Sequence, residues 1–335
     1  MRKTNFGMTR EQRLDYLNTR EVKDFYDRLR GKLSQTRGIV GAELTIPKTI
    51  LDLLSENLEY FSKLKKYVRL RTVKGEGRQI VSTDILEAIW TDAVQFYGEL
   101  KISFSGIEVE GYRVSGFISL NNCLLDGPTI DFANELEYLL GEAIGYALDK
   151  AILYGTGERM PLGFITRLAD KEDSQELLIS NIKKINTSSL SNGEFFKAIL
   201  SGLANAKINK SRNGFVLAMN ETTWKELILP EFFSVSSGIL TTETGILIPA
   251  LGAHVEFLNF IPHGDIAGGY MDQYLLVDFG RGKLSVSDQV RFMEDEIAFK
   301  GFKVYDGNPI YPDSFVLLNI NNEEPTTQIE FAKGN

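Results

Sequence analysis

Apolar residues at helical spacing predict three helices in the first half of the chain. The first is expected over residues 10–35, where charged residues fill the positions between the apolar ones. The second begins at Pro47, because proline suits the first position of a helix. The third and strongest starts at Ile130 and runs for more than six turns to Gly155, which we expect as a left-handed C-cap. Small residues along this third helix leave room for another element to approach closely: Gly141, Ala143, Gly145, Ala147 and Ala151.

Alternating apolar and polar residues predict strands around and beyond the second helix. Residues 67–73 alternate as a half-buried strand does. Residues 79–92 and 99–120 are strand-like and polar-rich, and together they form a long two-stranded excursion. A two-stranded hairpin is not stable alone in water, so another surface has to cover this one.

The second half of the chain mixes helices and strands. Polar residues 170–192 are expected to form a linker or an exposed loop. Asp306-Gly307 predicts a tight turn, and the polar residues 321–335 a loose tail. The other expected elements are a helix over 193–206, a buried strand over 214–220, a short helix over 221–229, strands within 246–262, and strands over 274–280, 283–290, 296–307 and 314–320. The fold class predicted by this pattern is α+β.

Composition narrows the classes of protein that fit. The chain has 335 residues and is 43% hydrophobic, enough to bury a core in one large or two ordinary domains. No window of 18 uninterrupted apolar residues occurs, and the first residues lack the apolar core of a signal peptide. The single cysteine, Cys123, excludes a disulfide framework within the chain and a cysteine-based zinc cluster. The chain has two histidines, too few for most histidine-centred catalytic and metal sites.

Charge is distributed unevenly. Residues 1–74 carry a net charge of +8, whereas residues 75–335 carry −16. Such asymmetry indicates an arm that touches an acidic partner or another copy of the chain, with a solvated basic helix face as the alternative.

Motifs that would carry catalysis are weak. Gly280-Arg-Gly-Lys283 lacks the spacing of a phosphate loop and is expected as a β-turn between two strands. His254 lies in an apolar run and His263 follows a proline, so we expect a packed residue and a turn residue, not catalytic bases. Cys123 is expected as a small buried residue, because nothing nearby in the sequence would lower its thiol pKa.

Clusters of charged residues give no stronger site. Glu294-Asp295-Glu296 precede a strand, on which neighbouring side chains point to opposite faces, so a solvated edge is favoured over a cation site. The basic loop with Lys207, Lys210 and Arg212 lacks interleaved aromatic residues, and the net charge of −8 argues against a dedicated nucleic-acid binder. We therefore predict no catalytic, cofactor-binding or metal site, no cofactor, and no enzymatic activity.

Two long segments carry a resemblance to a known family. They are ALDKAILYGTGERMPLGFIT (147–166) and YLLVDFGRGKLSVSDQVRFMEDEIAFKGFKVYDGNPIYPDSFVLLNI (274–320). The first resembles the place in tailed-bacteriophage major capsid proteins where the spine helix ends and a glycine-rich turn leads into a Pro-Leu-Gly-Ile strand. The second segment is similar to the final region of the same proteins, in its spaced phenylalanines and in its Tyr-Asp-Gly sequence. The order of the elements over about residues 40–320 also resembles that family.

The resemblance implies the Hong Kong 97-type capsid fold and a division of the chain. The implied parts are a mostly helical N-arm (1–45), a helix and strand leading into the body (46–74), an E-loop hairpin (75–115), a peripheral domain with the long spine helix (116–190 and 286–320), an axial domain (191–285) and a polar tail (321–335). In this fold the N-arm reaches along neighbouring subunits, and the E-loop lies over one of them. A hairpin that is unstable alone is thereby stabilised in every copy by the surface of a neighbouring subunit.

Two features of the family find no clear counterpart. Some members begin with a scaffolding domain of about a hundred residues that a protease removes, whereas about 45 residues precede the body here. Some members join subunits by a Lys–Asn isopeptide bond. Lys74 and Lys101 border the excursion, and Asn319, Asn321 and Asn322 lie near the end, but no motif brings them together, and surface roles are expected.

The function predicted from these observations is that of a major capsid protein. It would assemble into an icosahedral shell around a double-stranded DNA phage genome, built from pentamers and hexamers in the host cytoplasm and found in the virion. Its partners would be other copies, portal and scaffolding proteins and a decoration protein, with no membrane and no sequence-specific DNA binding. The alternatives are an encapsulin-like compartment that packages a cargo protein, and a soluble homo-oligomeric enzyme with an unrecognised site.

Overall fold

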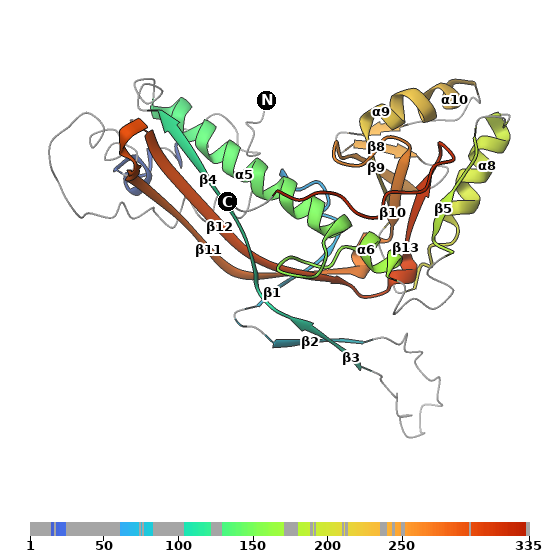
Figure 1. Ribbon diagram of the computed structural model, residues 1–335, viewed down its shortest axis with the longest axis horizontal. Coiled ribbons are helices and arrows are strands. Elements are labelled where there is room, and N and C mark those ends of the chain that lie inside the picture. The colour runs from blue at the N-terminus through green and yellow to red at the C-terminus, as the bar shows by residue number, and fades with distance from the viewer. Residues whose placement is uncertain are drawn as a thin grey trace, which may run out of the picture. The chain divides into compact units, whose positions relative to one another are not determined.

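The chain forms two compact units (Figure 1). Unit 1 comprises Met1–Lys66, Tyr112–Ile152 and Asp278–Tyr305, and unit 2 comprises Tyr67–Gly111, Leu153–Val277 and Asp306–Asn335. The structure, a computed structural model, describes residues 15–16, 18–24, 61–73, 75, 77–82, 104–121, 129–170, 180–187, 190, 192–209, 211, 214–234, 240–242, 245–248, 252–294 and 296–332.

The long helix α5 (Thr129–Tyr154) confirms the strongest helix prediction. Its apolar stripe is buried at Leu140, Leu148 and Ile152. The helix ends just before Gly155, as expected, but the predicted left-handed cap was wrong. The left-handed glycine is Gly157, with φ 81°, in the turn that follows.

Two glycines of α5 allow a close contact in unit 1. A Cβ at Gly141 would lie 2.4 Å from a ring carbon of Phe61, and one at Gly145 would lie 2.5 Å from the Phe61 carbonyl carbon. The Phe61 ring also meets Tyr138 edge-on, with centroids 5.4 Å apart. The expectation that small residues of this helix admit another element is confirmed, and that element is the segment at Phe61.

A four-stranded sheet has the order β1-β11-β12-β4. Its strands are β1 (Arg69–Thr72), β11 (Tyr274–Arg291), β12 (Glu296–Pro309) and β4 (Tyr112–Asn121). The antiparallel ladder between β12 and β4 runs without a break from the Glu296–Asn121 pair to the Tyr305–Tyr112 pair. β11 and β12 each continue along the chain from one unit into the other.

Two turns predicted in this region were wrong, because each lies within a continuous strand. Gly280–Lys283 lies inside the 18-residue β11. Gly280 has φ 62° and donates its N–H to Asp278 Oδ1 at 2.8 Å, so the local bend does not end the strand. Asp306-Gly307 lies inside β12. Turn propensity is a local preference, and pairing with neighbouring strands overrides it here.

A seven-stranded sheet forms the centre of unit 2. Its order is β5 (Ile182–Lys184), β13 (Phe315–Asn319), β10 (Asp265–Gly269), β6 (Phe215–Met219), β9 (Ala253–Phe257), β8 (Gly245–Ile248) and β7 (Leu240–Thr242). β13 pairs parallel with β5, and β6 pairs parallel with β9. The pairs β10–β13, β10–β6, β7–β8 and β8–β9 are antiparallel. Every residue of β10 and β13 is buried. β5 lies within the segment that was expected to be a linker or loop.

Helices surround this sheet. They are α6 (Phe164–Ala169), α8 (Asn192–Leu203), α9 (Glu221–Thr223), the π-helical turn η2 (Trp224–Ile228) and α10 (Leu229–Ser234). Short 3₁₀ turns occur at η3 (Met271–Gln273), η4 (Phe292–Glu294) and η5 (Pro312–Ser314). Phe195, Ile199 and Trp224 belong to the same buried core as the sheet residues Leu217 and Val316. The helices expected over 193–206 and 221–229 are thereby confirmed.

The strand expected after the Pro-Leu-Gly motif was wrong, because that segment is α6. Its buried residues Phe164, Ile165 and Leu168 have helical spacing. The Phe164 ring stacks on Phe315 of β13 with centroids 4.5 Å apart, which packs the helix on the sheet.

A two-stranded antiparallel ribbon is formed by β2 (Gly77–Ser82) and β3 (Phe104–Val109). The strand expected over 99–120 is divided at Glu110-Gly111, because β3 pairs with β2 whereas β4 pairs with β12. Trp90, Val94, Phe96 and Tyr97, expected at the tip of the excursion, lie outside the described residues.

The structure describes more of the C-terminal end of the chain than of the N-terminal end. The polar tail is not loose up to residue 326: Thr326 donates its N–H to Asp265 Oδ2 at 3.0 Å, and Glu323 donates to Asn319 Oδ1 at 3.0 Å. Of the first predicted helix, the structure describes helical residues among 15–24, where Val22 is fully buried. Most of that helix and nearly all of the second lie outside the described residues.

Candidate functional site

The two histidines each have a separate partner. The His254 ring, in β9, lies 5.8 Å from the Tyr67 ring, and Tyr67 donates to Glu256 Oε1 at 2.8 Å. His263 Nε2 lies 3.3 Å from Glu226 Oε2 on the surface. These contacts match a packed residue and a turn residue. Cys123 lies outside the described residues.

The acidic trio and the other carboxylates do not form a metal centre in the part of the chain that the structure describes. Glu296 Oε2 pairs with Arg291 Nη1 at 3.1 Å, and Glu294 is exposed in η4. No cluster of three or more histidine, cysteine, aspartate or glutamate side chains that could hold a metal ion occurs among the described residues.

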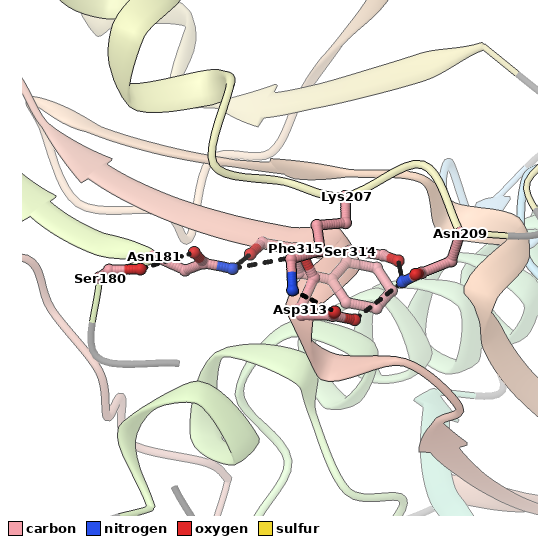
Figure 2. A network of polar contacts seen from close by, with 7 residues as sticks. All are labelled: Ser180, Asn181, Lys207, Asn209, Asp313, Ser314 and Phe315. Atoms are coloured by element: carbon pink, nitrogen blue, oxygen red, sulfur yellow. Dashed lines mark hydrogen bonds and ion pairs between the residues drawn. The ribbon is translucent and has the colours of Figure 1, made fainter. Parts of the chain in front are cut away.

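The basic loop is tied to its own unit. Lys207 Nζ lies 3.3 Å from Asp313 Oδ2, whereas Lys210 and Arg212 lie outside the described residues. Asn209, whose φ is 40°, donates to Asp313 Oδ1 and to Ser314 Oγ, both at 2.8 Å. Figure 2 shows how these side chains join the loop after α8 to η5.

The same network continues to the start of β5. Asn181 Nδ2 donates to the carbonyl oxygens of Asp313 and Phe315, at 3.4 and 2.9 Å (Figure 2). Lys207 also donates its backbone N–H to Asp313 O at 2.8 Å. The loop is therefore fixed to the sheet, which supports a structural role for Lys207.

One asparagine considered for a covalent cross-link is hydrogen-bonded at both polar atoms of its side chain. Asn319 is buried, its Nδ2 donates to Asp265 Oδ1 at 2.8 Å, and its Oδ1 accepts the N–H groups of Asn321 and Glu323. Asn322 has φ 61°, and Asn321 contacts His263. Lys74 and Lys101 lie outside the described residues, so the structure does not test a Lys–Asn bond.

Several residues of the β2–β3 ribbon are exposed, among them Arg78, Ile80 and Glu108. Arg78 lies opposite Glu108 in the register, and a Cβ at Gly106 would lie 1.7 Å from Arg78 Nε, so this glycine leaves the space that the arginine side chain crosses. Ile80 keeps 60% of its side-chain surface exposed. Among the described strands, each pairs with the other alone. Such a ribbon needs an additional surface to stabilise it.

The base of the ribbon is held at three points in unit 2. Val109 is 3% exposed. Arg71 Nη1 donates to the Ile80 carbonyl oxygen at 3.1 Å. The Glu110 N–H, directly after β3, donates to Asp306 Oδ2 at 2.7 Å.

The Pro-Leu-Gly and Tyr-Asp-Gly motifs meet beside this contact. Leu162 donates its N–H to Gly307 O at 2.8 Å, and Tyr274 Oη donates to Leu162 O at 2.9 Å. A Cβ at Gly307 would lie 2.7 Å from Tyr274 Oη, so glycine is required there. The sequence singled out both motifs without indicating that they touch.

Asp306 occupies the centre of this junction. Its Oδ1 accepts the Gly307 N–H at 2.7 Å and its Oδ2 accepts Glu110 N–H. Burial, together with the Glu110 charge, raises the pKa of Asp306 to about 6, although both backbone donors act to lower it. Complete burial of the Tyr274 phenol, together with the nearby charge of Asp306, raises the pKa of that phenol.

A second buried carboxylate makes an equivalent tie in unit 1. Asp149 of α5 accepts hydrogen bonds from Ser62 Oγ (2.7 Å), Leu64 N (3.0 Å) and Lys63 N (2.9 Å). Burial raises the pKa of Asp149 to about 6 despite these donors. The sequence contained a signal for this buried carboxylate. Asp149 lies between Leu148 and the apolar residues that begin at Ala151, on the buried side of the helix.

The observed geometry consists of structural ties and a projecting ribbon. Among the helices that the structure describes, none combines the length and apolar character needed to cross a membrane.

Solved structures with the same fold are capsid proteins. The capsid of the empty GTA particle has a TM-score of 0.53 and 13% identity over 85% of this chain and 92% of that one. The satellite phage P4 procapsid that includes the size determination protein has a TM-score of 0.52 and 8% identity over 80% and 98%. A chain of Mycobacterium phage Bobi has a TM-score of 0.50 and 12% identity over 78% of this chain and 91% of that one. A search of curated proteins found no match.

These likenesses define the class: the fold is the Hong Kong 97-type fold of phage capsid proteins. The sequence model of the phage capsid family matches residues 42–320, and the chain belongs to that family. It is a structural subunit of a capsid shell, a virion component that associates with copies of itself.

Proposed function

We propose that this chain is the major head subunit of a tailed phage and that it assembles into an icosahedral shell around a double-stranded DNA genome. The observation that carries the proposal is the family match over residues 42–320, which includes α5, the ribbon and both larger sheets. Membership of a structural capsid family supports a subunit without enzymatic activity.

The elements of the structure support a division of labour along the chain. We propose residues 1–45 as an N-arm along neighbouring subunits, the ribbon within 75–115 as the E-loop, α5 as the spine of the peripheral domain, and the seven-stranded sheet as the centre of the axial domain. Because β5 and β13 belong to that sheet, the axial part in this proposal also takes residues 180–187 and 315–319. An exposed ribbon with no further strand among the described residues suits an element that docks on another copy.

Other partners follow from the proposed role. A closed phage head needs a portal for DNA entry, and we propose a portal protein, a scaffolding protein and a decoration protein as partners, with assembly in the host cytoplasm. The shell would enclose DNA without reading its sequence, as the net charge of −8 suggests.

The contents of the purified particle test this function. Particles isolated from cells that produce the phage would be treated with nuclease, and the protected nucleic acid and all proteins would then be identified. The proposal predicts protected double-stranded DNA of uniform length. Shells that hold a single enzyme and no DNA would overturn it and show an encapsulin-like compartment. A soluble small oligomer would show that the chain forms no shell.

A further inference from the structure

We propose that Asp306 is the residue that anchors the β2–β3 ribbon and positions it for docking on a neighbouring copy. The inference rests on the proposed function of the ribbon as an intersubunit arm. It assigns a role to the Tyr-Asp-Gly motif, which the sequence singled out without explaining.

The ribbon ends where the chain passes from β3 to β4. β3 ends at Val109 and β4 begins at Tyr112, so residues 110 and 111 are the point at which the chain changes from one sheet to another. Asp306 Oδ2 accepts the Glu110 N–H at 2.7 Å at this point. A hydrogen bond to an ionised acceptor is about twice as strong as a neutral one. A single side chain from β12 therefore fixes the pivot of the ribbon.

Asp306 itself is rigidly held. Its Oδ1 accepts the N–H of Gly307, whose carbonyl oxygen accepts the N–H of Leu162 at 2.8 Å. Tyr274 Oη closes the loop of contacts by donating to Leu162 O at 2.9 Å. The carboxylate is 7% exposed, so water competes weakly for its oxygens. Glu110 and Tyr274 are titratable groups close to this carboxylate.

The other two points at the base of the ribbon, buried Val109 and the Arg71 hydrogen bond, leave the Glu110 N–H without a substitute for Asp306 Oδ2. Arg71 Nη1 reaches the carbonyl oxygen of Ile80 at 3.1 Å, on the other strand and at an exposed position. Without Asp306, the Glu110 N–H would lose its acceptor, and the ribbon would sample more directions from the same folded unit. Docking on a neighbour would then require ordering of the pivot, which slows assembly.

The test compares Asp306→Ala and Asp306→Asn with Asp278→Asn in the full-length protein. Asp278 is a matched control because it is also 7% exposed and accepts a backbone N–H, that of Gly280. It lies in β11, the strand that pairs with the β12 strand of Asp306. Hydrogen exchange of the unassembled subunit would be read at the Glu110 amide. We expect Asp306→Ala to lower its protection about 10- to 100-fold, and Asp306→Asn, which keeps one oxygen acceptor, to lower it less. Asp278→Asn should leave it unchanged.

Assembly is read separately from folding. We expect Asp306→Ala subunits with a wild-type far-ultraviolet circular dichroism spectrum to form closed shells at least tenfold more slowly by light scattering, with Asp306→Asn intermediate and Asp278→Asn near wild type. Unchanged protection at Glu110 would overturn the anchor. Lost protection with wild-type assembly would overturn the positioning role. A wild-type chain that forms no shells under any condition would refute the proposed function, whereas the exchange experiment would still decide on the anchor.

Discussion

Single buried carboxylates hold together segments that are far apart in the sequence. Asp149 receives three hydrogen bonds from residues 62–64, and Asp306 receives the amide of Glu110 from 196 positions away. A buried carboxylate is unfavourable unless its oxygens are hydrogen-bonded. Backbone N–H groups supply such bonds in both cases, and the Ser62 hydroxyl adds a further one at Asp149. Such residues fix the arrangement of the chain at the cost of a raised pKa.

Asp149 should make stability depend on pH. Its pKa is raised from 3.8 in the unfolded chain to about 6 in the folded one, so the folded state binds the proton more tightly. The destabilisation from this group is therefore absent below about pH 4, grows as pH rises, and is complete above about pH 6, where it reaches about 3 kcal/mol. We expect Asp149→Asn to remove this part of the pH dependence.

Urea unfolding at pH 4.5, 5.5 and 7 measures that difference. The control is Glu142→Gln, which changes an exposed carboxyl on the same helix. An identical slope of unfolding free energy against pH in wild type and Asp149→Asn would contradict the assignment.

Gly145 tests the contact between α5 and Phe61. Alanine is about 1 kcal/mol better than glycine in a helix, but its Cβ would lie 2.5 Å from the backbone of Phe61. Because a backbone atom cannot move aside as a flexible side chain can, the clash dominates, and we expect Gly145→Ala to destabilise by about 2 kcal/mol. Thermal unfolding measures this. Gly116→Ala, with no atom within 4 Å of the added Cβ, should change stability by less than about 0.5 kcal/mol. Equal effects of the two substitutions would exclude the close contact.

At the scale of elements, the loop between α8 and β6 depends on Asn209. Its side chain makes two hydrogen bonds to η5, and its φ of 40° is unfavourable for most side chains. Asn209→Ala loses the bonds and keeps the strain, whereas Asn209→Gly loses the bonds and relieves the strain. We expect Asn209→Ala to lower the free energy of unfolding by about 3 kcal/mol and Asn209→Gly to lower it by about 1 kcal/mol, both measured by urea denaturation. A glycine variant as unstable as the alanine variant would show that the backbone conformation contributes nothing.

Long periodic elements could be predicted from the sequence, whereas their interruptions could not. The spacing of apolar residues placed α5 within one residue of its observed ends, because a helix of this length has one consistent buried face. The turns expected at Gly280 and Asp306 were wrong, since pairing across β11 and β12 decides their conformation and is invisible locally. The contacts of Asp306 could not be predicted for the same reason. The sequence indicated the Tyr-Asp-Gly motif, but the hydrogen bond from Glu110 forms between residues 196 positions apart, which only the fold brings together.

At the scale of the whole molecule, the charge asymmetry predicts an effect of salt on assembly. Residues 1–74 carry +8 and the remainder −16, so basic arms should attract acidic neighbours. Raising the salt concentration shortens the screening length from about 10 Å at 0.1 M to about 3 Å at 1 M, and we expect assembly followed by light scattering to slow. The double variant Arg20→Gln and Lys23→Gln, at two exposed positions, should assemble more slowly at low salt and respond less to added salt. Assembly that is independent of salt would contradict the electrostatic contribution.

The direct test of the central claim is electron microscopy of the purified full-length protein under assembly conditions. Membership of the phage capsid family, the fold and the projecting ribbon all require that the chain build a shell from copies of itself. We predict closed isometric shells in which subunits are grouped in fives and sixes, with density from each ribbon lying on an adjacent subunit. A discrete dimer or other small oligomer, with no shells across the salt and pH range tested, would contradict the account.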